Sequence, residues 1–139
     1  MDIPRDLRKK LVEEIRFVVQ KIGTEKDPRT KLYYFSAIYG EMFRLLNIHF
    51  DRELVLAHGV LNHAYQAMKT RADIIVMGRD TIIDFPDRFF DALTEHLDQL
   101  ANHIENNEDI YSTLQDITCL AYITTGNGYY LFQKGILGI

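Results

Sequence analysis

The chain has 139 residues, of which 47% are hydrophobic and 26% charged, and its net charge is −4. This length and this balance suit one folded domain over residues 1–139 and exclude intrinsic disorder, which needs low hydrophobicity and high net charge. The single cysteine, Cys119, excludes an internal disulfide, no apolar run approaches the roughly 20 residues that cross a bilayer, and the negative balance argues against a nucleic-acid partner.

The first two predicted helices are amphipathic and carry their own start and stop signals. The first covers residues 4–22, because Pro4 suits a first helical turn and Gly23 suits a C-terminal cap. Asp27 is a typical N-cap for a second helix over residues 28–47. Apolar residues recur at spacings of three and four, which predicts a buried stripe on each helix. They are Leu7, Leu11, Ile15, Val18, Val19 and Ile22 in the first helix and Leu32, Phe35, Tyr39, Met42 and Leu46 in the second.

A third helix is predicted over residues 52–69, with Asp51 as its N-cap. Its small residues, among them Gly59, would allow a neighbouring helix to approach closely. The segment 72–85 is ambiguous, because two β-favouring runs flank a turn-like sequence at 78–80. It is either a small hairpin or a short helix or irregular connection, and an isolated hairpin is only marginally stable.

Two more helices complete the predicted fold. The fourth starts near Asp84 and Pro86 and ends at Asn106, and the fifth covers residues 109–125. We therefore predict an all-α protein, an antiparallel up-and-down helical bundle of four long helices with short extra helices or a small hairpin near 72–85. Its shared interior should contain the central stripe residues Phe35, Leu61, Leu97 and Ile117.

Charge is unevenly distributed along the chain. Residues 1–31 carry nine basic and six acidic side chains, a net +3, whereas residues 84–116 carry one basic and nine acidic side chains, a net −8. We expect the basic first helix to pack beside the acidic fourth helix, because each then relieves the self-repulsion of the other. The alternative is an acidic face that binds a basic partner.

The five histidines do not form a recognisable metal site. His96 and His103 are seven residues apart, which on a helix separates them by about 10 Å along the axis. No histidine follows a glutamate by three residues, so the ligand pairing of di-iron bundles is missing. We predict no bound metal and no cofactor.

Residues 58–65 resemble the motif of the HEPN helical ribonucleases, in which an arginine precedes a histidine by four to six positions and a tyrosine can follow two positions later. His63 and Tyr65 match this pattern, and His58 stands where the family has its arginine. The resemblance covers eight residues. It implies a degenerate, metal-independent ribonuclease with His58, His63 and Tyr65 as catalytic candidates.

The favoured function is non-enzymatic. Residues 129–139 hold seven large apolar side chains in eleven, whereas chain ends are normally polar. This segment either closes the end of the bundle or docks on a second subunit, and the second reading predicts a homodimer, or binding of an unidentified protein partner, through an interface that includes Tyr129, Tyr130, Phe132 and Leu137.

A pocket between helices is the alternative function, as a small-molecule-binding or enzymatic bundle. Its predicted lining is Tyr39, Met42, His58, His63 and His96. The charged start of the chain lacks the apolar stretch of a signal peptide, and one cysteine suits a reducing compartment, so we expect a cytoplasmic protein.

Overall fold

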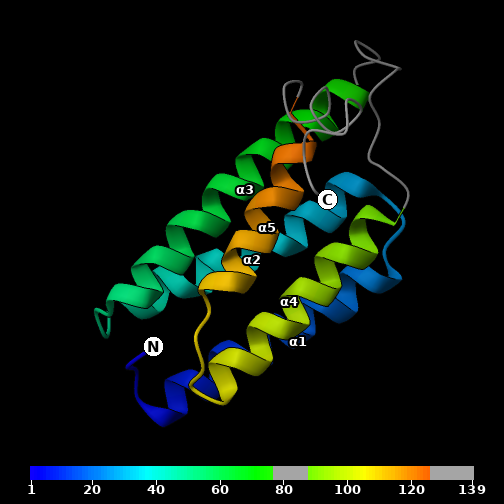
Figure 1. Ribbon diagram of the computed structural model, residues 1–139. Coiled ribbons are helices and arrows are strands. Elements are labelled where there is room, and N and C mark those ends of the chain that lie inside the picture. Colours follow the sequence, from blue (N-terminus) through cyan, green and yellow to red (C-terminus); the bar gives the residue numbers. More distant parts are fainter. Residues whose placement is uncertain (77–87, 126–139) are drawn as a thin grey trace.

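The computed structural model describes residues 1–76 and 88–125 of the chain, and within them all regular structure is helical. The five helices are α1 (Arg5–Thr24), α2 (Pro28–Leu46), α3 (Arg52–Val76), α4 (Phe89–Glu105) and α5 (Tyr111–Ile123). Figure 1 shows them as roughly aligned rods. The predicted all-α fold is therefore confirmed for the described residues, none of whose helices is long and apolar enough to cross a membrane.

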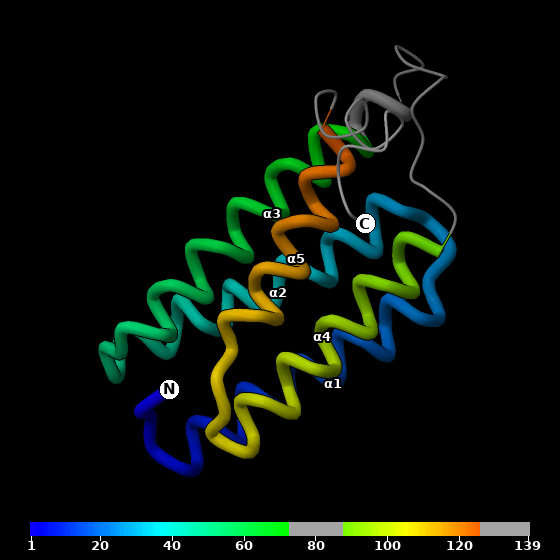
Figure 2. Tube along the Cα trace, viewed as in Figure 1, coloured from blue at the N-terminus to red at the C-terminus, as the bar shows by residue number. Residues whose placement is uncertain are grey.

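Each helix packs against two others, so that the five form a closed ring. Going around it, α1 contacts α2, α2 contacts α3, α3 contacts α5, α5 contacts α4, and α4 contacts α1. In Figure 2, α1, α3 and α5 run one way and α2 and α4 run the other. Among these neighbours, only α3 and α5 are parallel. Helix α5, predicted over residues 109–125 and observed over Tyr111–Ile123, thus holds a full place in the ring between α3 and α4.

The interior is made by the predicted stripes. Phe35, Leu61, Leu97 and Ile117 are fully buried and belong to one connected hydrophobic core, as predicted. The spacing of three and four continues through every helix, so that each rod contributes one apolar side to the centre of the ring. Helices α1 and α4 contribute fully buried side chains to this core, among them Leu11, Ile15, Ile22, Leu93 and Leu100.

Two predicted N-caps are observed. The carboxylate of Asp27 accepts hydrogen bonds from the backbone N–H of Thr30 at 3.0 Å and from the Thr30 hydroxyl at 2.7 Å. Asp51 accepts one from the backbone N–H of Leu54, also at 3.0 Å. These bonds satisfy N–H groups that a helix start leaves without intrahelical partners, so α2 and α3 begin where the sequence predicts.

Helix α3 is longer than predicted. It ends at Val76 instead of near residue 69. Residues 72–76 are therefore helical, and the alternative prediction of a hairpin that starts at residue 72 is wrong for these residues. The buried spacing continues through Met68 and Ala72, and adding residues to an existing helix gains one hydrogen bond each, which outweighs a weak β preference. The rest of the ambiguous segment, residues 77–85, lies outside the described residues, as do Asp84 and Pro86.

The basic first helix does pack beside the acidic fourth helix. The guanidinium of Arg16 donates to both carboxylate oxygens of Glu105 at 3.0 Å and to the side chain of Asn102 at 2.9 Å. Arg8 donates to the backbone carbonyl of Ile104 at 2.7 Å. The charge segregation seen in the sequence is therefore used within the chain.

Candidate interaction surface

Helices α3 and α5 enclose a groove on the outside of the ring. It consists of two shallow hollows of about 410 and 120 Å³ that meet at His63 and Thr118. The described residues that line the groove come from both helices. They are Val55, Leu56, Gly59, Val60, His63, Ala64 and Ala67 on α3 and Thr118, Ala121, Tyr122 and Thr125 at and after α5.

None of these eleven lining residues is Asp, Glu, Lys or Arg. Because 26% of the chain is charged, about three charged residues would be expected in a set of eleven. The same neutrality extends along both helices: positions 54–68 of α3 carry no charged side chain, and α5 carries one, Asp116. Asp116 and Thr118 are two residues apart, which places them on opposite sides of the helix.

Large apolar side chains remain exposed on this face. Leu56 is 40% exposed, Val55 is 38% exposed and Tyr122 is 39% exposed. Isolated exposed apolar residues are common, whereas a set of them around an uncharged groove is typical of interaction sites. We call the eleven residues the α3–α5 face.

Gly59 lies on the part of this face that Val55, Leu56 and Val60 also line. The sequence suggests that it allows a neighbouring helix of the same chain to approach, but Gly59 is exposed and a Cβ atom built on it would meet nothing within 4 Å. The alanines do serve that purpose, since Ala57 and Ala64 are buried. Packing within the chain therefore gives no reason for a glycine at position 59.

The predicted catalytic and pocket residues divide into two groups. Tyr39 on α2 lies beside His58 and Tyr65 on α3, with ring centroids 6.0 and 5.5 Å away, and desolvation by burial raises the pKa of Tyr39. His58 also stacks on Phe43, 5.4 Å away. His63 faces the other way, towards α5. The structure thus separates the two histidines of the ribonuclease-like motif onto different sides of α3.

Met42 and His96 do not join this cluster. Met42 is fully buried in the core, and His96 lies on α4, which contacts α1 and α5 but neither α2 nor α3. Nδ1 of His96 is buried without a hydrogen-bond partner. In the described part of the chain, no group of three His, Cys, Asp or Glu side chains could hold a metal ion.

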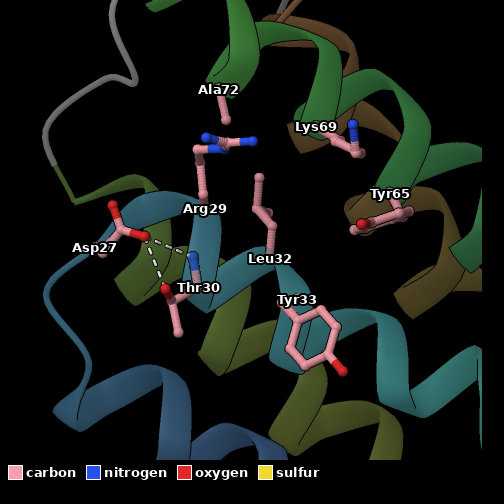
Figure 3. Close-up of a pocket in the computed structure, with 8 residues that line it drawn as sticks. All are labelled: Asp27, Arg29, Thr30, Leu32, Tyr33, Tyr65, Lys69 and Ala72. Atoms are coloured by element: carbon pink, nitrogen blue, oxygen red, sulfur yellow. Dashed lines mark hydrogen bonds between the residues drawn. The ribbon is translucent and has the colours of Figure 1, made fainter. Parts of the chain in front are cut away.

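A separate hollow of about 540 Å³, away from the α3–α5 groove, lies between the start of α2 and the later part of α3. Figure 3 shows Arg29 reaching from α2 towards Ala72, with Lys69 and Tyr65 on the side of α3. Tyr33 also lines this hollow. Of the predicted site residues, only Tyr65 is among its described lining.

The predicted interface residues Tyr129, Tyr130, Phe132 and Leu137 lie outside the described residues. No protein-family model, curated protein or solved structure matches the chain.

Proposed function

We propose that this protein acts without catalysis, by associating with a second copy of itself through the α3–α5 face. The observation that carries the proposal is the neutrality of that face, whose eleven lining residues include no charge in a chain that is 26% charged. Interface centres are depleted in lysine, aspartate and glutamate, while aromatic residues such as tyrosine are enriched there.

A neutral face can meet its own copy without bringing like charges together. The commonest oligomers are twofold dimers, in which the same patch of both subunits forms the contact. The exposed face of α1 is different, because charged side chains such as Arg5, Lys9, Lys10 and Glu13 stand there. If that surface paired with itself, each charge would need an opposite charge on the partner. Burying Leu56 and Tyr122 against a partner, in contrast, lowers the free energy, because apolar surface leaves water.

The apolar C-terminal residues belong to the same proposal. Thr125 lines the groove, and the predicted interface residue Tyr129 follows it by four positions. The last described residue therefore lies at the groove, and the predicted interface residues follow it in the sequence.

This face is preferred over the α2–α3 hollow as the functional site. The hollow owes its polar character to Arg29 and Lys69, and both side chains already take part in interactions of their own. The described lining of the groove between α3 and α5 contains no such charged groups, so a partner can cover these residues without breaking ion pairs of theirs. The single Cys119 agrees with a cytoplasmic setting.

The test is a charge placed on the face, compared with the same charge placed elsewhere. Leu56→Glu puts a carboxylate in the groove, and Phe17→Glu puts one on α1, where Phe17 is 52% exposed. In sedimentation equilibrium at micromolar concentration, the wild-type chain and Phe17→Glu should be dimers. Leu56→Glu should raise the dissociation constant at least tenfold, because a buried unpaired charge is costly.

Circular dichroism of all three chains checks that each is folded. A wild-type chain that stays monomeric, or a Leu56→Glu chain that associates as well as Phe17→Glu, would contradict the proposal.

A further inference from the structure

His63 occupies the centre of the α3–α5 face. It is exposed, and it lines both hollows of the groove. Among the described lining residues it is the only histidine, and histidine is the side-chain type whose charge ordinarily changes between pH 5 and pH 8. Acidification therefore turns an uncharged face into one that carries a positive charge at its middle.

Among the described residues, the neighbours of His63 offer no negative charge to compensate. On its own helix, positions 54–68 contain no acidic residue. From the described part of α5 and its end, the residues that share the groove with it are Thr118, Ala121, Tyr122 and Thr125, none of which is Asp, Glu, Lys or Arg. Asp116, the acidic residue of α5, lies on the opposite side of that helix from Thr118. The titratable groups His58 and Tyr65 face α2.

We propose that a second copy of this chain covers His63 at neutral pH and that protonation of His63 releases it. This inference rests on the proposed function, because it needs the two faces to meet. An imidazolium covered by an apolar partner loses hydration and gains no counter-ion. A twofold contact doubles the effect, since each copy contributes its own His63.

The sign of the pH dependence follows from proton binding. The separated chains accept protons that the dimer excludes, so association weakens as the pH falls. Each histidine can change the dissociation constant by up to tenfold per pH unit, and the dimer has two. Between about pH 7.5 and about pH 5.5 we expect the dissociation constant to rise by about tenfold to a hundredfold.

The experiment measures the dissociation constant of the full chain by sedimentation equilibrium at both pH values. The wild-type chain is compared with His63→Gln and His63→Asn, which cannot be charged, and with His58→Gln, which removes a histidine from the other side of α3. Circular dichroism at both pH values checks that the helices persist.

The readout is the ratio of the two dissociation constants of each chain. It should be at least ten for the wild type and for His58→Gln, and close to one for the His63 variants. A wild-type dimer with a ratio near one, or a His63 variant that keeps the wild-type ratio, overturns this inference and leaves self-association standing.

If neither neutral variant associates at either pH, His63 contacts the partner directly and is not the pH-sensing group, which also overturns the inference. A wild-type chain that is monomeric at both pH values removes the proposed function and this inference together.

Discussion

Gly40 and Gly59 form a matched pair that separates stability of the fold from use of the surface. Both are exposed, both lie in the interior of a helix, and a Cβ atom built on either would meet nothing within 4 Å. Glycine in a helix interior is less favourable than alanine by about 0.8–1 kcal/mol. With no contact to lose, each glycine-to-alanine change should therefore stabilise the isolated chain.

For Gly40→Ala we expect the free energy of unfolding to rise by about 1 kcal/mol and the melting temperature by about 3 °C. Urea denaturation followed by far-ultraviolet circular dichroism should show a higher midpoint with an unchanged slope. Gly59→Ala should give the same gain when measured on the Leu56→Glu background, at a concentration at which that variant is monomeric. Gly40→Ala can be measured on the wild-type chain, because Gly40 lies on α2, away from the α3–α5 face, and its substitution should not affect association.

The two substitutions should differ in association. Gly59 lines the groove, so its new methyl group enters the contact with a partner and should weaken the dimer, whereas Gly40→Ala should leave the dissociation constant unchanged. A lower urea midpoint for Gly40→Ala would refute the reasoning on stability, because it would mean that the added methyl group meets a neighbour. Equal dissociation constants for both variants would refute the close approach at Gly59.

Two further predictions concern contacts between helices. Nε of the buried Arg71 donates to the backbone carbonyl of Thr124 at 2.8 Å, so Arg71→Met should lower the free energy of unfolding by about 1–3 kcal/mol in urea denaturation, while Lys9→Met, at an exposed site, should change it little. The hydrogen bonds from Arg16 lower the pKa of Glu105 in the folded chain. The contribution of Glu105 to stability is therefore fully present above its unfolded pKa of about 4.3 and is lost as the pH falls through the lower folded value. Arg16→Gln should reduce the loss of stability on acidification in thermal melts between about pH 5 and about pH 3, and an unchanged acid profile would contradict this.

Local signals in the sequence predicted where α2 and α3 start, but Gly23, the predicted C-terminal cap of the first helix, lies inside α1, which ends at Thr24. The Asp27 and Asp51 caps are observed because a short carboxylate side chain at the start of a helix can accept hydrogen bonds from the free N–H groups of the first turn. The stripes around Phe35 and Leu61 are buried because helical spacing fixes which residues share a side. The end of α3 was missed, since the β preference of residues 74–76 is weak beside the hydrogen bonds of an established helix.

The arrangement of the helices and the candidate site could not be predicted in the same way. Periodicity shows which side of a helix is buried but not which neighbour covers it, so the place of α5 between α3 and α4 has no signature in the sequence. The neutral face did leave a signal, namely the absence of charge from 54–68. Its meaning depends on knowing that Leu56 and His63 lie beside a second uncharged helix.

The position of the groove follows from the number of helices in the ring. Helices that alternate in direction can pair antiparallel all the way around only if their number is even. With five described helices one neighbouring pair must be parallel, and that pair is α3 with α5 (Figure 2). Parallel neighbours align their helix dipoles, which is less favourable than the antiparallel arrangement.

Small side chains at this seam, Ala64, Ala67 and Ala121, let the two backbones come close but fill little of the outer edge. Helix α5 has 13 residues against the 25 of α3, so it also covers only part of its neighbour. Among the described residues, the seam between α3 and α5 is therefore the least completely filled contact of the ring. In the proposed dimer, a twofold axis perpendicular to the helices lays the α3 of one copy antiparallel to that of the other, which covers the apolar groove and opposes the aligned dipoles in one contact.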